Sequence, residues 1–245
     1  MAIKRPKFIT GQIYHIFNRG VERRNIFQQI SDNFRFIFCL YELNDKKLVK
    51  MRDRIEIRKE NKKYTGSTGV SDRKDKREPL VEIISFCLMP NHYHLILHQL
   101  VDGGISLFMK KLSNGYTGYF NEKYNRKGIG ALFQGRFKAV HVEDDRQLMA
   151  LICYIFTNPL ELLEKNWKEV GVKDVEEAVK FLESYRWSSY LDYIGIPNFP
   201  SVTKRDFVTE FFGSSDKIKK SVEDWILYKT ELKSGFEIIK NIILE

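Results

Sequence analysis

The sequence predicts an α+β fold, because stretches with the period of a β-strand alternate along the chain with stretches that have the period of a helix. Residues 12–18 alternate in polarity, residues 80–88 form a β-branched and aromatic apolar run, and residues 105–124 carry one apolar stripe at helical spacing. The 245 residues suffice for one large domain with an extension. We expect a main domain at residues 1–160 and a mostly helical C-terminal extension at residues 161–245.

The first half of the main domain is predicted as a strand, a helix and an insertion. Residues 12–18 form the strand. Ser31-Asp32 supplies an N-cap, and the apolar residues that follow recur at helical spacing to about residue 43. Residues 44–79 are crowded with Lys, Arg, Asp and Glu. We expect a charged insertion there, partly structured at first and then mobile, and more consistent with a solvated loop than with a binding arm.

The second half is predicted as a hairpin followed by a helix, a strand and another helix. Pro90-Asn91 is a turn sequence between two apolar runs. The acidic run at 143–145 opens the last helix, because acidic residues favour a helix N-terminus, and Asn158-Pro159 ends it. The predicted strands lie at 80–88, 92–99 and 132–142, and the long helix between the last two at 105–124.

The resulting order is β-α-β-β-α-β, followed by a further helix. This order is typical of the ferredoxin-like split βαβ fold, in which antiparallel strands form one sheet. The helices of such a fold lie on one face of the sheet. We therefore expect the other face to be free for a functional site.

The composition is that of a soluble globular protein, with 43% apolar and 30% charged residues and no run of 18 apolar residues. The N-terminal residues lack the apolar core of a signal peptide. Cys39, Cys87 and Cys153 lie in apolar surroundings without metal-type spacing, which indicates buried thiols in a reducing compartment. We expect a cytoplasmic protein with no membrane partner.

The net charge of +9, from 41 Lys and Arg against 32 Asp and Glu, suggests a polyanionic partner. The chain is also rich in rings that can stack on bases, with 3 Trp, 12 Tyr and 18 Phe. Charge alone does not separate a nucleic-acid partner from a surface that is basic for solubility.

His92 and His94 are the strongest candidates for a metal site. Alternate residues of a strand face the same side, so the two imidazoles would lie about 6.6 Å apart at Cβ and could share one ion. Without further support, two histidines on one strand face are more often packed or solvated than bound to a metal. By the same alternation His98 would share this face, but it would lie about 13 Å from His94 along the strand, too far to bind the same ion.

Tyr154 and Asn158 are one helical turn apart and would lie on the same face of the last helix of the main domain. A tyrosine hydroxyl in an apolar neighbourhood needs a partner. By themselves, however, the two residues are better explained as a core tyrosine and a helix-ending Asn-Pro.

Several motifs occur together in one order along the chain. They are Tyr14-His15-Ile16-Phe17-Asn18-Arg19-Gly20, Met89-Pro90-Asn91-His92-Tyr93-His94-Leu95, Phe133-Gln134-Gly135-Arg136-Phe137-Lys138, Tyr154-Ile155-Phe156-Thr157-Asn158-Pro159 and Arg186-Trp187-Ser188-Ser189-Tyr190. With these motifs the chain resembles, over roughly residues 10–195, the REP-associated tyrosine transposases, which are single-tyrosine transposases of the HUH endonuclease superfamily. The insertion at 44–79 is longer than the family pattern.

The resemblance implies a role for each residue of the two central motifs. His92 and His94 would be metal ligands, Asn158 the third protein ligand and Tyr154 the catalytic nucleophile. The implied metal is Mg²⁺ or Mn²⁺, and the implied partner is single-stranded DNA with a hairpin. The implied reaction nicks and rejoins the strand through a covalent 5′-phosphotyrosine intermediate. Members of the family differ in whether the tyrosine serves its own active site or that of a partner, so a homodimer is compatible with the sequence.

Basic, aromatic and amide side chains of the first and third motifs, and of the basic loop after the first, are candidates for DNA contacts. Arginine and lysine side chains contact phosphates, tyrosine stacks on unpaired bases, and glutamine hydrogen-bonds to base edges. Core packing for the tyrosine and a turn position for the glutamine are the alternatives. The candidate DNA-binding residues are Arg19, Arg23, Arg24, Arg136, Lys138, Gln134 and Tyr14.

Three functions are compatible with these observations. The first is a metal-dependent transposase. The second is a domesticated nicking enzyme that acts on repeated hairpins in its own genome, which the sequence does not separate from the first. The third is a catalytically inactive nucleic-acid-binding or regulatory protein that recognises such hairpins. A structural zinc protein fits least, because no cysteine neighbours the histidine pair.

Overall fold

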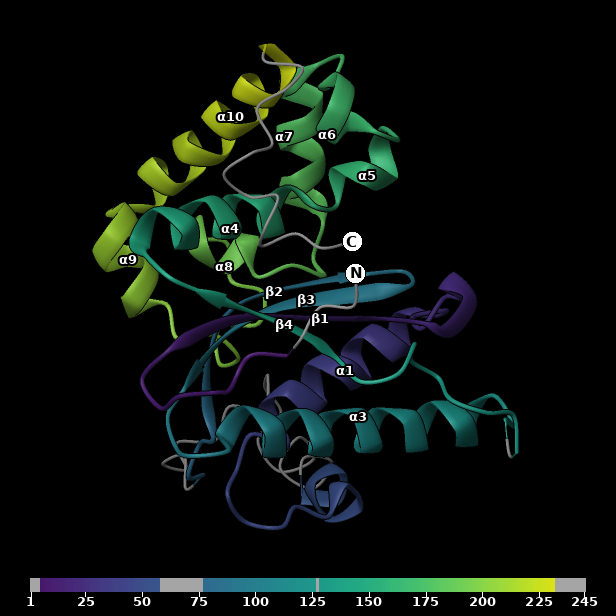
Figure 1. Cartoon of the computed structure of the whole chain (residues 1–245). Coiled ribbons are helices and arrows are strands. Elements are labelled where there is room, and N and C mark those ends of the chain that lie inside the picture. The colour runs from purple at the N-terminus through teal and green to yellow at the C-terminus, as the bar shows by residue number, and fades with distance from the viewer. Residues whose placement is uncertain (1–4, 58–76, 127, 232–245) are drawn as a thin grey trace.

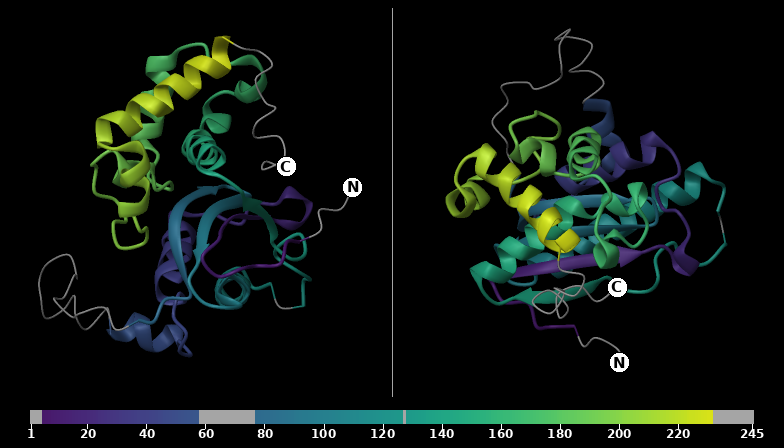
Figure 2. Two further views of the ribbon diagram at one scale, coloured as in Figure 1. Left: turned by 60° about the vertical axis from the view of Figure 1, so that its left-hand side comes forward. Right: turned by 90° about the horizontal axis from the view of Figure 1, so that it is seen from above.

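The computed structural model describes residues 5–57, 77–126 and 128–231. A four-stranded sheet forms its middle layer, two helices cover one face, and a larger group of helices lies against the other (Figures 1 and 2). The α+β class is thereby confirmed. None of the helices in the described ranges combines the length and apolar character needed to cross a membrane. The three cysteines are buried and form no disulfide.

The sheet has the strand order β2-β3-β1-β4, and every neighbouring pair is antiparallel. This is the strand order of the predicted split βαβ fold. The β1–β3 register sets Phe17 opposite His94 and Arg19 opposite His92. It therefore brings the first motif beside the histidine pair. The strands are β1 (Ile13–Arg19), β2 (Val81–Met89), β3 (His92–Gln99) and β4 (Lys138–Val142).

Strand β4 begins at Lys138 and is shorter than the strand expected at 132–142. The segment before it crosses the end of β1: the backbone N–H of Gln134 donates to the carbonyl of Arg19 at 2.8 Å. Gly135 has φ 76°, a conformation that glycine adopts without a Cβ clash. The segment is therefore a loop that holds Gln134 beside the end of β1.

Helices α1 (Ile30–Glu42) and α3 (Gly104–Lys123) cover one face of the sheet, where Tyr93, Leu95 and Leu97 enter a common core with them. Both helices were predicted. Residues 51–57 of the charged insertion are helical, while its expected mobile part at 58–76 lies outside the described residues. A short 3₁₀ helix, η1 (Val21–Arg23), follows β1.

Helix α4 (Asp145–Thr157) lies against the opposite face, so the expectation that this face would be free of helices is wrong for most of its length (Figure 1). Ile84, Cys87 and Ile96 point to this side and are buried under α4. Strands that are apolar on both faces need a layer on each. At the end of the sheet near His92, the described side chains of His92 and Arg19 are partly exposed, and Lys138 of the edge strand β4 is exposed.

The described part of the C-terminal extension, residues 161–231, is mostly helical, as predicted, and shares one apolar core with α4. It also covers the edge strand β2. Leu88 donates its backbone N–H to Trp187, and Ser189 donates to Phe86, at 2.9 and 3.0 Å. The motif at 186–190 therefore protects a strand edge that would otherwise expose unpaired backbone groups. The helices are α5 (Leu160–Leu163), α6 (Trp167–Val170), α7 (Val175–Ser184), α8 (Tyr190–Tyr193), α9 (Asp206–Phe212) and α10 (Ser215–Glu231).

Candidate active site

Tyr154 of α4 lies against His94 of β3 within one chain. The two rings meet edge to face, with centroids 5.7 Å apart and planes at 87°. Both side chains are buried, with 2% and 0% of their surface exposed. Asp144 is the N-cap of helix α4, and its carboxylate accepts from the backbone N–H of Gln147. The apolar stripe of α4 packs against β2. The packing of that stripe brings Tyr154 to the histidine pair.

Lys168 of α6 joins Tyr154 to Asn158. Its ammonium Nζ donates to the phenol oxygen of Tyr154 and to Oδ1 of Asn158, each at 3.2 Å. It also lies 4.6 Å from the centre of the Tyr154 ring. Asn158 is 1% exposed, and its Nδ2 has no hydrogen-bond partner among the described residues. Tyr154 and Asn158 therefore share one cation, as residues one turn apart on one helix face can.

His92 and Asn91 form the second half of the site. Oδ1 of Asn91 lies 2.6 Å from Nδ1 of His92, and Nδ2 of Asn91 donates to the carbonyl of Arg23. That second bond fixes the orientation of the amide, so its oxygen faces the imidazole. Because an amide oxygen only accepts, Nδ1 of His92 carries a proton, and in the neutral imidazole Nε2 then carries the lone pair. The rings of His92 and His94 have centroids 5.1 Å apart.

His15 contacts His94 from the neighbouring strand β1. Nε2 of His15 lies 2.9 Å from Nδ1 of His94, and both side chains are fully buried. The ring of Phe17 stacks on both, with centroid distances of 4.9 and 5.8 Å. His94, which was predicted as a metal ligand, is thus held by His15, to which the sequence assigned no role.

The donor set fits a divalent cation. His92 has the tautomer of a metal-bound histidine whose other ring nitrogen donates to an oxygen. Two neutral imidazoles and an amide oxygen form an uncharged ligand set. Such a set is less typical of Mg²⁺ sites than carboxylates are, and it is also compatible with Mn²⁺. Within the described ranges, no group of three or more His, Cys, Asp or Glu side chains converges as a metal site. The predicted ligand set does not meet this criterion, because it contains two histidines and Asn158, and asparagine is not one of these residue types.

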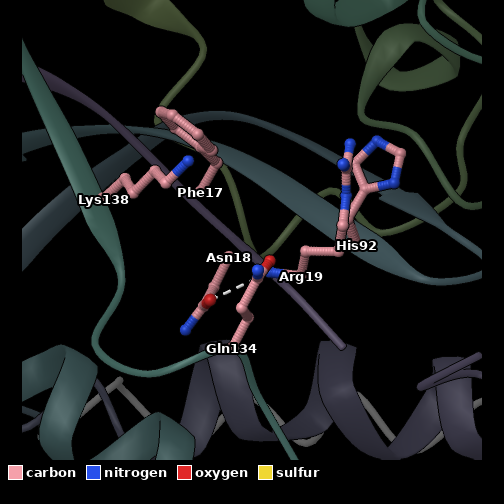
Figure 3. Close-up of a pocket in the computed structure, with 6 residues that line it drawn as sticks. All are labelled: Phe17, Asn18, Arg19, His92, Gln134 and Lys138. Carbon is pink, nitrogen blue, oxygen red and sulfur yellow. Dashed lines mark hydrogen bonds between the residues drawn. The ribbon is translucent and has the colours of Figure 1, made fainter. Parts of the chain in front are cut away.

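A pocket opens beside His92, at the accessible end of the sheet (Figure 3). Lys138 of β4 and the ring of Phe17 lie on one side of it, with the ammonium 5.6 Å from the ring centre. Gln134 and Lys138 are exposed, so a ligand can reach them. Three of the predicted DNA-binding residues therefore share one pocket with a predicted metal ligand. The lining residues are Phe17, Asn18, Arg19, His92, Gln134 and Lys138.

Arg136 lies just outside this pocket and is exposed. It forms a cationic group with Arg5, whose guanidinium lies 3.9 Å from the ring centre of Phe137 and donates to the carbonyl of that residue. Burial and then the neighbouring Arg136 lower the pKa of Arg5. The positive charges of Arg5 and Arg136 repel each other, and this repulsion favours an anionic partner at this position.

Tyr14 is placed differently from the expectation that it stacks on a base. It is 1% exposed and points to the face covered by α1 and α3. Its hydroxyl donates to the carbonyl of Lys7 and accepts from the N–H of Ile9. Alternation along β1 sends Tyr14 and His15 to opposite faces, so the prediction for Tyr14 is wrong.

Arg23 and Arg24 lie beyond the end of β1 and do not line the pocket. Arg24 pairs with Glu22 at 3.2 Å and donates to the carbonyl of Val21, which uses much of its donor capacity. Arg23 is exposed, and its carbonyl accepts from Asn91. Both remain at the rim of the site.

Sequence reasoning missed Lys168, and His15 was left without a role. No spacing rule links Lys168 to Tyr154, because the contact depends on how α6 folds back onto α4. His15 had a usable signal: it is the polar residue between Ile13 and Phe17 on one face of an otherwise apolar strand.

Comparison with known proteins gives one family match, in the central segment of the chain. Residues 73–158 match the model of the family described as "Transposase IS200 like". The matched segment contains His92 and His94 as well as Tyr154 and Asn158. No curated protein matches the chain. Among solved structures, a REP-associated tyrosine transposase bound to a REP hairpin has 15% sequence identity and a TM-score of 0.47, with 81% of this chain and 90% of that chain covered.

Proposed function

We propose that this chain, whose residues 73–158 match the IS200-like transposase family, is a DNA transposase that nicks and rejoins single-stranded DNA with Tyr154 as its nucleophile. The observation that supports this best is the contact between Tyr154 and His94 in one chain, with Asn158 tied to the tyrosine hydroxyl through Lys168. A core tyrosine requires neither neighbour. Because one chain supplies all of these groups, we propose an active site that acts in cis, whether or not the protein forms a homodimer.

The proposed reaction begins with the phenol oxygen of Tyr154. It loses its proton to solvent and attacks a backbone phosphorus. A bond forms between that oxygen and phosphorus, the bond from phosphorus to the 3′-oxygen breaks, and the 3′-oxygen takes up a proton from water. The products are a 5′-phosphotyrosine and a free 3′-hydroxyl. The phosphodiester energy is kept in the covalent intermediate, so the reverse reaction rejoins a strand.

His92, His94 and the oxygen of Asn158 would hold Mg²⁺ or Mn²⁺. When bound, the ion polarises the non-bridging phosphate oxygens and stabilises charge on the leaving oxygen. The ammonium of Lys168 already lies at the nucleophile. A fixed cation stabilises negative charge on the phenol oxygen as it enters and leaves the bond with phosphorus.

The pocket beside His92 would hold the DNA backbone next to the scissile phosphate. Arg19 and Lys138 supply cationic donors on opposite sides of it, and Gln134 supplies an amide that can pair with a base edge. Arg136 extends the basic surface outside the pocket. A strand with unpaired bases next to a hairpin fits this arrangement, because the pocket contacts backbone and base edge together.

The test is incubation of the protein with single-stranded hairpin DNA and Mn²⁺, followed by a denaturing gel. We expect a covalent protein–DNA adduct that is absent in Tyr154→Phe. Tyr228→Phe, which removes an exposed hydroxyl on α10, is the matched control and should keep the adduct.

Two outcomes would count against the proposal. An adduct that persists in Tyr154→Phe would assign the nucleophile to another residue. Binding without any adduct, across a broad library of hairpins, would favour the inactive hairpin-binding protein over the enzyme.

A further inference from the structure

The strand β1 places an imidazole where an apolar residue would be expected. His15 lies between Ile96 of β3 and Val140 of β4 in the sheet register, and it is 0% exposed. A buried polar side chain without a hydrogen bond lowers the stability of the fold. Its bond to Nδ1 of His94 at 2.9 Å explains how it is tolerated. The pair is therefore a built feature of the sheet and not a surface coincidence.

One proton lies between the two rings, and two arrangements of it are chemically distinct. If Nδ1 of His94 donates, Nε2 of His15 accepts, and Nε2 of His94 carries a lone pair. If Nε2 of His15 donates, Nδ1 of His94 accepts, and the proton of His94 sits on Nε2. Only the first arrangement leaves His94 able to ligate a cation through Nε2.

The neighbouring His92 has a partner at Nδ1 whose role is set by that partner's own hydrogen bond to Arg23. His92 must carry its proton on Nδ1, because Oδ1 of Asn91 faces it at 2.6 Å and only accepts. A partner that is able to accept at Nδ1 therefore exists for each histidine of the pair, one from the turn before β3 and one from β1. Partners of this kind fix the tautomer and orientation of metal-bound histidines.

We infer that His15 is a positioning residue: its buried Nε2 accepts the Nδ1–H of His94 and thereby presents Nε2 of His94, like that of His92, to a divalent cation. The inference rests on the metal site of the proposed function. The ring of Phe17 stacks on both imidazoles and holds them in one orientation. His15 touches no reacting atom and acts only through His94.

The direct test uses the metal-free protein. Nitrogen-15 NMR of its 5 histidines reports which ring nitrogen carries the proton of each neutral imidazole. We expect His15, His92 and His94 all to carry it on Nδ1. A proton on Nε2 of His94 would overturn the inference whatever the activity of the protein.

Two substitutions of His15 separate positioning from packing. His15→Leu keeps apolar volume but has no acceptor, whereas the Oε1 of His15→Gln approximates the position of Nε2. We expect His15→Leu to bind Mn²⁺ about 10–100-fold more weakly, as removal of such partners does. His15→Gln should restore most of the affinity. His141→Gln is the control, because Nε2 of His141 bonds to Gln12 and not to the site.

Calorimetric titration with Mn²⁺ alone gives the affinities, and circular dichroism confirms folding. Unchanged affinity in His15→Leu, with wild-type binding intact, would overturn the role of His15 and leave the proposed function standing. A wild-type protein that binds no Mn²⁺ would overturn the metal site of the proposed function, and this inference with it.

Discussion

The ammonium of Lys168 donates to Oδ1 of Asn158 at 3.2 Å, and this oxygen is the one that the predicted metal set requires. A divalent cation that binds it either displaces the ammonium or takes the second lone pair of the oxygen, and in both cases lies close to a positive charge. Two like charges a few ångströms apart oppose each other even near a protein surface. Lys168 therefore competes with the metal while it supports the tyrosine.

We expect Lys168→Met to bind Mn²⁺ more tightly than the wild type, by about tenfold or about 1.4 kcal/mol. The substitution removes both the competitor for Oδ1 and the charge that repels the ion. Titration calorimetry on the metal-free proteins measures the change. Lys165→Met removes an exposed lysine from the same segment and should leave the affinity unchanged. Weaker binding in Lys168→Met would show that the lysine organises the site and does not compete for it.

His92→Ala and His94→Ala should both abolish Mn²⁺ binding but differ in stability. His94 is fully buried against His15 and Tyr154, so its truncation leaves a cavity and should lower the free energy of unfolding by roughly 2–4 kcal/mol. His92 is only partly buried, and its loss should cost less than about 1 kcal/mol. Urea unfolding and Mn²⁺ titration of the same preparations separate the two effects. Equal destabilisation would contradict the burial difference.

Arg19→Ala and Lys138→Met should weaken binding of single-stranded DNA and reduce its salt dependence. Each lost phosphate contact lowers the slope of log K against log salt by about 0.7 for a single strand. Fluorescence anisotropy over a range of salt concentrations measures the slope. Lys110→Met is the matched control, because this exposed lysine lies on α3, which covers the opposite face. A slope that falls equally in the control would remove the pocket from the DNA path.

Asp32 should stabilise the fold in a pH-dependent manner. Burial alone would raise the pKa of its carboxyl, but hydrogen bonds outweigh burial and lower it. A pKa below the unfolded value adds stability that is present above about pH 4 and is lost as the pH falls through the folded-state pKa. The donors that lower the pKa are the side chains of Lys123 and Tyr124 and the backbone N–H groups of Gln29 and Gln28, and the hydroxyl of Tyr119 donates to the same carboxylate.

Asp32→Asn should therefore lower the free energy of unfolding by about 3 kcal/mol at pH 7. The substitution removes the buried carboxylate charge and leaves the ammonium of Lys123 without its ion-pair partner. The difference from the wild type should persist at about pH 5 and shrink at about pH 3. Urea unfolding at the three pH values tests this. Asp102→Asn, at an exposed position, should change stability little at any of them. A constant difference at all three pH values would exclude the carboxylate as its source.

The order of elements and the central motifs could be predicted because they depend on local patterns. The Pro90-Asn91 turn, the alternation through β3 and the Asp144 cap each act over a few residues. The same alternation set His92 and His94 on one face, and the helical turn set Tyr154 beside Asn158. These relationships hold wherever the elements pack.

The placement of α4 could not be read from its own sequence. Its apolar stripe fits either face of the sheet, and the choice follows from β2 and β3, which present apolar residues on both sides. Tyr14 shows the same limit, because alternation separates it from His15 without saying which of the two faces the site. The error for Tyr14 and the role missed for His15 have this one cause.

The sequence by itself determined the order of strands and helices, the histidine pair and the tyrosine turn, because each is a matter of spacing along the chain, whereas the start of β4 at Lys138 was not predicted. The tertiary structure alone decided that α4 lies over His94, that Lys168 reaches Tyr154 and Asn158, and that His15 holds His94. Those contacts join residues far apart in sequence. They follow from the burial of whole apolar faces, which no local pattern specifies.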